Sequence, residues 1–259
     1  RECTLEQIEE IKRNTDIEIE CFIHGAMCIA ISGRCLMSQY VFGENANRGA
    51  CIQPCRREYR IFDNDDEKNE LVLGEDYVLS PKDLCTLEFI NRLIDAGIDS
   101  FKIEGRKRSP EYVARVTRVY RQAIDMHFAG TLDRKARQAL IAQLSEVYHR
   151  GFSKGFYFGA PSAEDYARRY GSGATTRKQH IGKVLEYTSA HKVARILMQA
   201  DTLTEGDRIY IIGDDTGVAE GTVNAIMHEE RRVGSAEKGQ EIAIPFDRQV
   251  HEEDQVYKI

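Results

Sequence analysis

The sequence has no apolar run of the roughly eighteen residues that a transmembrane helix requires. It also shows no signal-peptide pattern and no Asn-x-Ser/Thr acceptor for glycosylation. These absences favour a cytoplasmic protein that has no membrane partner. The first residue is Arg1 rather than Met, and no start-like segment precedes it. We therefore expect the chain to be a fragment of a longer protein.

Recognisable protease motifs are also missing. A His-Glu-x-x-His zinc site fails because Arg232 stands where the second histidine would follow His228. Residues 151–155 match Gly-x-Ser-x-Gly, but a nucleophile elbow needs a strand before the serine and a helix after it. We expect a helix before this segment and an aromatic run after it, so we read the match as coincidental. A Cys/His nucleophile pair stays open, because several of both residues are present.

Neither part of the chain is basic overall. The net charge is −6, of which residues 178–259 contribute −5 and residues 1–177 contribute −1. Wholesale wrapping of nucleic acid is therefore not expected, although local basic patches are compatible with this balance. The length of 259 residues suits one large domain or two ordinary ones.

Cysteine is concentrated in one short stretch. Of seven cysteines, Cys28, Cys35, Cys51 and Cys55 fall within 28 residues, with glycines between them. An odd number of thiols in a reducing compartment indicates ligands or catalysts rather than disulfides. Their density suits a soft metal or an iron–sulfur cluster. The spacing itself matches neither the ferredoxin patterns nor a zinc ribbon, so cluster, zinc and inert thiols all stay open.

Residues 1–160 alternate between strand and helix patterns, which predicts parallel strands. The segment 80–83 should open a helix that reaches about residue 95, with Pro81 in its first turn. The helix over 110–124 should carry an apolar stripe of Val113, Val116, Tyr120, Ala123 and Ile124. We expect strands over 17–23, 77–80 and 100–104, a loop over 43–55, and helices over 4–13, 80–95, from 110 onward and over 132–148.

The pattern changes after a polar linker at residues 161–180, and we place the boundary near 178. Short alternating runs separated by Gly/Asp turns predict a small all-β barrel or sandwich. These runs cover residues 181–187, 193–199, 207–213, 221–228 and 240–246.

The region around Cys28 resembles the signature of the peptidase U32 family, a family labelled as collagenase-like proteases. The matching residues are Glu20, Phe22, Gly25, Ala26, Met27, Cys28, Gly33, Cys35, Met37 and Ser38. The resemblance continues through residues 47–51, 55–59, 80–84, 100–106 and 148–157, and it covers about residues 1–160. Agreement spread over so many segments is highly specific.

The resemblance implies an α/β plus all-β fold. Residues 1–160 would be the C-terminal part of a (β/α) TIM-like barrel, whose N-terminal part is absent here. Residues 161–180 would link it to a small elongation-factor-like β-barrel over residues 181–259. With barrel strands missing, apolar edges would be exposed, and a homo-oligomer would be a natural consequence.

The resemblance also implies an activity. The family includes oxygen-independent hydroxylases of tRNA, ribosomal RNA or quinone precursors; several carry a 4Fe–4S cluster, and the RNA-acting members draw on prephenate. A C-terminal extension is more typical of the tRNA-acting and the long collagenase-labelled members. We therefore expect hydroxylation of a tRNA uridine. The alternatives are collagenase-like proteolysis of a protein or peptide substrate, and a non-catalytic binding module.

For the cofactor, the resemblance assigns cluster ligation to Cys28, Cys35, Cys51 and Cys85. Cys55 competes for the third place, because it follows Cys51 by only four residues. All five are therefore candidate metal ligands, with zinc as the alternative metal. Cys3 and Cys21 are expected to be packing residues.

Charged residues near the cysteines complete the candidate site. Lys102, Glu104 and Arg106 end a predicted strand, which is where (β/α) barrels build their sites. They could hold a carboxylate or phosphate, with Arg106 as a bidentate fork, or form an internal salt bridge. Glu20 and His24 flank the first cysteine and would contact substrate, support the ligands or form a structural pair.

Basic side chains are frequent both near the cysteines and along residues 102–122. A basic surface of this kind would suit an RNA backbone, although charge runs are usually solvated helix faces. The residues concerned are Arg34, Arg48, Arg56, Arg57, Arg60, Arg106, Lys107, Arg108, Arg115, Arg118 and Arg121.

Overall fold

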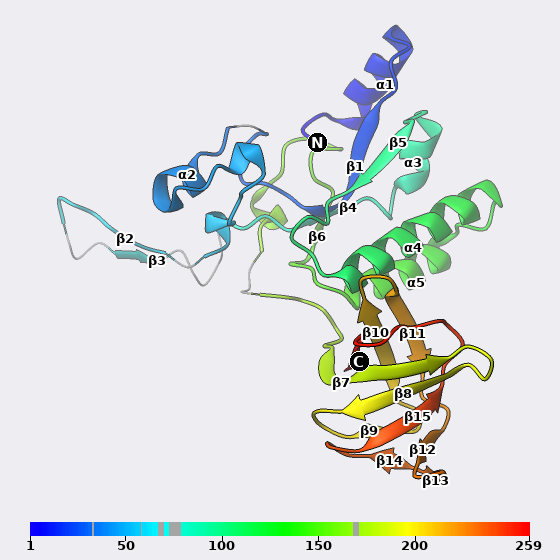
Figure 1. Cartoon of the computed structure of the whole chain (residues 1–259). Helices are drawn as coiled ribbons and strands as arrows, with labels where there is room; N and C mark the ends of the chain where they lie inside the picture. Colours follow the sequence, from blue (N-terminus) through cyan, green and yellow to red (C-terminus); the bar gives the residue numbers. More distant parts are fainter. Residues whose placement is uncertain (33, 58, 67–69, 73–78, 168–170) are drawn as a thin grey trace. The chain divides into compact units, whose positions relative to one another are not determined.

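The computed structural model describes residues 1–32, 34–57, 59–66, 70–72, 79–167 and 171–259. Gly33 and residue 58 of the family signature lie outside these ranges, as do the first two residues of the strand expected at 77–80. Leu79 and Ser80, the other half of that strand, are not in a strand. The chain forms two compact units, residues 1–108 with 115–174, and residues 109–114 with 175–259 (Figure 1).

The first unit is built on a mixed four-stranded sheet. Its order is β5 (Ser100–Ile103), β1 (Glu20–Ala26), β4 (Asp83–Cys85) and β6 (Phe152–Ser153). β1 is parallel to β5, and β4 is parallel to β6, but β1 and β4 are antiparallel. The prediction of parallel strands throughout is therefore wrong at the centre of the sheet. A long irregular connection joins β1 to β4 and reverses the chain, where a crossover helix would have kept its direction.

Most helices of this unit begin where the sequence predicts. α1 (Leu5–Asn14) starts with a capping box, in which Thr4 and Gln7 each bind the other's backbone N–H. α4 (Pro110–Phe128) and α5 (Arg134–Ser145) follow. The buried stripe of α4 includes Tyr120 and Ala123 as expected, but Val113 is 41% exposed and does not belong to it.

The helix expected over 80–95 is wrong in its first half. Residues 83–85 form β4, and the helix α3 covers only Ile90–Asp95. The reason is tertiary: β4 is buried along its whole length between β1 and β6, and Asp83 is 1% exposed. Pairing on both sides outweighs the local helix-start signal of Pro81.

The connection between β1 and β4 contains short elements of its own. α2 (Met37–Phe42) ends at Gly43, which adopts the left-handed conformation. The 3₁₀ turn η1 (Ala46–Arg48) begins at Asn45, whose side chain accepts the N–H groups of Asn47 and Arg48. η2 (Pro54–Arg56) and the hairpin strands β2 (Arg60–Phe62) and β3 (Glu70–Val72) follow. The sequence predicts only a loop over 43–55, because these turns carry no hydrophobic period.

The second unit confirms the expected run of short strands, except over residues 221–228, where one strand ends at Thr222 and the next begins at Ile226. An eight-stranded antiparallel sheet has the order β11, β10, β16, β7, β8, β15, β12, β13, and β9 pairs with β14 separately. Hairpin neighbours and a shared core of aliphatic side chains hold it together. The strands are β7 (Gln179–Thr188), β8 (Val193–Met198), β9 (Leu203–Thr204), β10 (Arg208–Gly213), β11 (Gly217–Thr222), β12 (Ile226–His228), β13 (Arg231–Val233), β14 (Ser235–Ala236), β15 (Glu241–Pro245) and β16 (Gln255–Lys258).

The segment expected to be a linker is partly ordered onto the first unit. It contains the turn η3 (Ala163–Asp165). The Lys82 N–H donates to the Asp165 carbonyl at 2.8 Å, and the Ala167 N–H donates to the Ser80 carbonyl at 2.7 Å. Residues 163–167 are thus tied to the start of β4.

Tyr120 fastens α4 to the sheet. Its buried hydroxyl donates to the Ile23 carbonyl at 2.9 Å and accepts the Thr86 N–H at 3.0 Å. We expect Tyr120→Phe to lower the free energy of unfolding by about 0.5–1.5 kcal/mol, because the hydroxyl bonds are lost while the Thr86 N–H keeps its own bond to the Ile23 carbonyl at 3.1 Å. Urea unfolding followed by circular dichroism checks this. Tyr40→Phe is the control, since Tyr40 is 81% exposed; an equal effect of both changes would contradict the assignment.

Candidate functional site

A cavity of about 350 Å³ lies at the end of β1 and contains most of the candidate residues. Its size is within the range of small-molecule sites. Four cysteines share its wall, Cys28, Cys35, Cys51 and Cys55, and each is partly exposed with a free thiol. The other lining residues are Arg1, Ala26, Met27, Ile31, Ser32, Ala46, Asn47, Gly49, Gln53, Pro54, Arg56, Glu104, Arg106 and Lys107.

The thiols of this cavity act on one another electrostatically. Burial raises the pKa of the Cys55 thiol, Cys28 and Cys51 raise it further, and Arg56 opposes them. The Cys51 sulfur accepts the Gln53 N–H at 3.4 Å, and the Ser38 hydroxyl donates to it at 3.9 Å. The cation therefore acts on Cys55, and the two donors act on Cys51.

Cys85 lies elsewhere. It is 7% exposed in β4, pairs with His24 across the sheet, and its sulfur lies 3.7 Å from the Tyr120 hydroxyl. Burial raises the pKa of its thiol to about 11. The structure thus brings together four of the five candidate ligands, including Cys55, and leaves Cys85 in the core. Cys21 is buried, as a packing residue would be, whereas Cys3 is exposed.

The cavity offers thiol donors without a site for a single ion. Within the described ranges, no three His, Cys, Asp or Glu side chains lie close enough together to hold one metal ion. Four thiols distributed around a wall suit a larger group in which each thiolate binds a different iron, as in a 4Fe–4S cluster. Thiolates are the usual ligands of such clusters and also bind zinc, so the donor chemistry of this wall fits either group.

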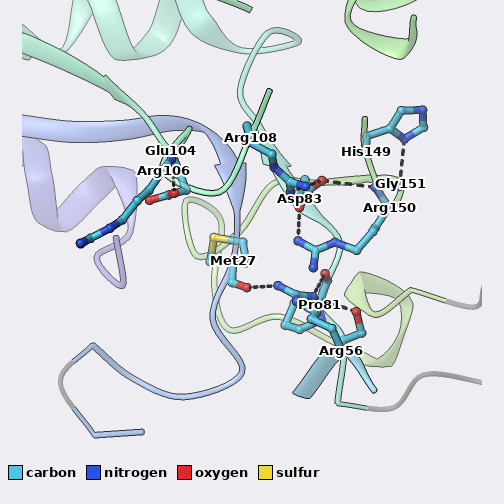
Figure 2. Close-up of polar contacts among 11 residues, drawn as sticks. Met27, Arg56, Pro81, Asp83, Glu104, Arg106, Arg108, His149, Arg150 and Gly151 are labelled. Carbon is cyan, nitrogen blue, oxygen red and sulfur yellow. Dashed lines mark hydrogen bonds and ion pairs between the residues drawn. The ribbon is translucent and has the colours of Figure 1, made fainter. Parts of the chain in front are cut away.

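One wall of the cavity carries a fixed guanidinium. Arg56 donates to the Met27 carbonyl at 2.5 Å, and to the Ser80 hydroxyl and the Pro81 carbonyl at 2.8 Å each (Figure 2). Burial, together with the nearby Arg150, lowers the pKa of Arg56 to about 10. Three bonds in different directions hold this cation beside Cys55, so it can act on whatever the cavity contains.

Asp83 is the carboxylate behind this wall. It forms an ion pair with Arg150 and a longer one with Arg108 at 3.4 Å, and it accepts the Arg150 N–H at 3.2 Å (Figure 2). Sequence reasoning gave Asp83 and Arg150 no role, although both lie in segments that carry the family resemblance. Only their burial, which a sequence does not state, identifies them.

Glu104 and Arg106 line the cavity, whereas Lys102 does not. The Arg106 N–H donates to the Glu104 carboxylate at 2.9 Å, and the Arg106 guanidinium lies against Gly49. A Cβ at Gly49 would overlap that guanidinium, and one at Gly25 would lie 2.5 Å from the Glu104 carbonyl oxygen. The two glycines therefore make room for this charged pair.

Lys102 and Glu20 form the internal salt bridge that the sequence left as an alternative. Their side chains meet at 2.9 Å and are about half exposed. Lys102 lowers the pKa of the Glu20 carboxyl through a hydrogen bond. Neither residue lines the cavity, so the structure separates them from Glu104 and Arg106.

The Gly-x-Ser-x-Gly segment does not have the surroundings of a nucleophile elbow. Ser153 ends β6, and a turn follows it where an elbow requires a helix. The Ser153 hydroxyl accepts the Gly155 N–H at 3.2 Å. These contacts describe a turn, in agreement with a coincidental match.

Comparison with known proteins places this geometry in a family context. The model of peptidase family U32 matches residues 1–167. A collagenase of Porphyromonas gingivalis is 44% identical over 93% of this chain and 58% of its own length. The tRNA hydroxylation protein P1 of Bacillus subtilis is 36% identical over 89% of this chain and 55% of its own length.

Two further comparisons cover less. A 23S rRNA 5-hydroxycytidine synthase of Escherichia coli is 40% identical over 58% of this chain and 24% of its own length. The solved C-terminal domain of a U32 peptidase of Geobacillus thermoleovorans is 17% identical, with a TM-score of 0.30 over 31% of this chain and 92% of that one. The chain spans only about three fifths of the length of curated relatives that it matches. No helix in the described ranges is long and apolar enough to cross a membrane.

His24 lies beneath the cavity, in the core of the sheet. It is 2% exposed, and its Nδ1 lies 3.3 Å from the Tyr120 hydroxyl. Burial lowers the pKa of the imidazole to about 4, against an opposing effect of Asp83. His24 is therefore neutral at pH 7, as part of the framework that carries the site.

This burial predicts a pH dependence of stability. Because the pKa of His24 is lower in the folded than in the unfolded chain, its stabilisation is present above about pH 6.5 and is lost as the pH falls toward 4. We expect wild type to lose roughly 3 kcal/mol more than His24→Gln over this interval. Urea unfolding at several pH values measures the two slopes, and parallel slopes would contradict the assignment.

Proposed function

The chain belongs to peptidase family U32, and on that premise we propose that it is part of an enzyme that hydroxylates RNA without oxygen. A tRNA uridine is the proposed substrate. Support comes from the relatives named for hydroxylation of tRNA and of ribosomal RNA. The proposal concerns the whole protein, since the chain spans only part of these relatives.

The observation that carries the proposal is the meeting of four thiols with the fixed guanidinium of Arg56 in one cavity. Cys28, Cys35, Cys51 and Cys55 supply the sulfur ligands of a 4Fe–4S cluster in this proposal. Such a cluster supplies one-electron chemistry when bound. Arg56 stands beside these ligands and offsets the negative charge that four thiolates bring into a partly buried space.

The remaining wall suits an organic anion. Arg106 and Lys107 are exposed at the cavity, and Glu104 is its acidic lining residue. A guanidinium backed by a glycine can meet a carboxylate with two parallel hydrogen bonds. We assign Arg106 to the carboxylate of a co-substrate such as prephenate, with Glu104 orienting the Arg106 backbone.

For the fold, we propose that the mixed sheet is completed in the whole protein by further strands of a (β/α) barrel. The second unit is then the elongation-factor-like β-barrel that the sequence suggests, and its antiparallel sheet supports this assignment.

The cluster has a direct test. Anaerobically prepared protein should contain about four iron and four sulfide per chain. Cys28→Ser and Cys55→Ser should each lower this content strongly, since each removes a ligand. Cys85→Ser should leave it near wild type, because Cys85 lies outside the cavity. The measurement is iron and acid-labile sulfide with visible absorption.

Cys3→Ser is the matched control, since Cys3 is exposed and does not line the cavity. If the protein contains zinc and no iron, the proposed cluster is wrong and the cavity binds a structural metal. Loss of iron in Cys85→Ser but not in Cys55→Ser would restore the ligand set that the family resemblance implied. Neither iron nor zinc in any preparation would overturn the metal site.

The RNA substrate has its own test. Deleting the gene should remove one hydroxylated uridine from cellular tRNA, as measured by mass spectrometry of nucleosides. Return of the wild-type gene should restore the modified uridine. Return of a gene with Arg106→Gln should restore it poorly, because the carboxylate of the co-substrate loses its two parallel hydrogen bonds to the guanidinium. Unchanged tRNA in the deletion strain would refute the tRNA assignment.

Proteolysis is a second candidate, because relatives with higher identity carry the name collagenase. A thiol of the cavity would be the nucleophile in this case. Degradation of gelatin that is lost in Cys28→Ser, in protein free of iron, would favour proteolysis over hydroxylation.

A further inference from the structure

The segment between β1 and β4 displays aromatic and apolar side chains that the first unit does not cover. Of the six residues of α2, only Ser38 is buried. Tyr40 is 81% exposed, Val41 is 58% exposed and Phe42 is 38% exposed. Neighbouring exposed apolar side chains of this kind mark an interaction site in many proteins.

Basic side chains accompany these residues. Residues 34–57 contain four arginines and one acidic residue, in a chain whose net charge is −6. The Arg57 guanidinium lies over the Phe42 ring, 4.4 Å from its centroid. Arg34 and Arg48 are exposed in the same segment. Aromatic rings among arginines are the combination that binds single-stranded nucleic acid, by stacking on bases and by pairing with phosphates.

The same segment also builds the cavity. Between α2 and η2 it contributes Asn47, Gly49, Cys51 and Gln53 to the cavity wall. A strand of RNA held on α2 would therefore lie on the segment that encloses the reacting groups. Enzymes that act on a base need that base unstacked and delivered to a pocket, so a stacking platform next to the cavity serves this purpose.

We propose that Arg34, Tyr40, Val41, Phe42, Arg48 and Arg57, here named the Tyr40 surface, bind a single-stranded segment of the RNA substrate. This inference rests on the proposed function and adds to it the surface that receives the RNA. The hairpin of β2 and β3 is excluded, because Asp63, Asp65 and Asp66 follow Phe62 and would repel phosphates.

The test uses the complete chain and a fluorescein-labelled oligouridylate of roughly twelve nucleotides, a length within the usual range of single-strand sites. Fluorescence anisotropy measures binding at several salt concentrations. Tyr40→Ala should weaken binding roughly 5- to 150-fold through loss of stacking. Tyr40→Phe keeps the ring and should stay within about twofold of wild type. Arg48→Gln should reduce the salt slope by about 0.7.

Phe128→Ala is the matched control, because Phe128 is an exposed aromatic residue, 75% exposed, at the end of α4 and outside the Tyr40 surface. Its binding should equal that of wild type. Circular dichroism should be unchanged in all variants, since the replaced side chains are exposed.

Each other outcome overturns the proposal in a distinguishable way. If wild type binds and Tyr40→Ala binds equally well, the Tyr40 surface is wrong while an RNA substrate stands. If wild type does not bind the oligonucleotide, the RNA part of the proposed function fails as well. If sedimentation shows a dimer that Tyr40→Ala dissociates, the surface belongs to a second copy of the chain.

Discussion

The ion pairs of Asp83 are the constraint on which the first unit depends. This carboxylate is almost fully buried, and such a charge is stable only with partners. Arg150 supplies both its guanidinium and its backbone N–H, and Arg108 adds a second cation. The short strands β4 and β6 share only two residue pairs, so their backbone hydrogen bonds alone would hold them together weakly. The ion pairs of Asp83 strengthen this attachment.

The position of the cavity follows from that constraint. Arg56 binds the chain immediately before Asp83, at Ser80 and Pro81, and it also binds the end of β1 at Met27. The thiol-bearing segment is thereby attached to both central strands through one guanidinium. Long irregular segments otherwise have few means of taking a defined position. Here the buried Arg56 guanidinium holds the segment in place, as backbone hydrogen bonds would in a helix or strand.

The predictable parts of the fold are those with local signals. The capping box of Thr4 and Gln7 predicts α1, and Pro110 predicts the start of α4. The alternating pattern of short strands predicts the second unit. For residues 83–85 the local signal is misleading: Pro81 and Asp83 predict a helix start, whereas β4 depends on buried ion pairs with Arg108 and Arg150, which lie in distant segments. For the site, cysteine density predicts the stretch that lines the cavity, but spacing does not separate Cys55 from Cys85, because only burial distinguishes them.

The close contact between Gly49 and Arg106 has a consequence for how the molecule can change over generations. The guanidinium occupies the space that any side chain at position 49 would need, so the two positions are coupled although 57 residues separate them. A larger residue at 49 would push the end of the Arg106 side chain out of this place, and the left-handed backbone at position 49 would strain it as well. A change at position 49 would therefore alter the charged wall of the cavity without touching any charged residue.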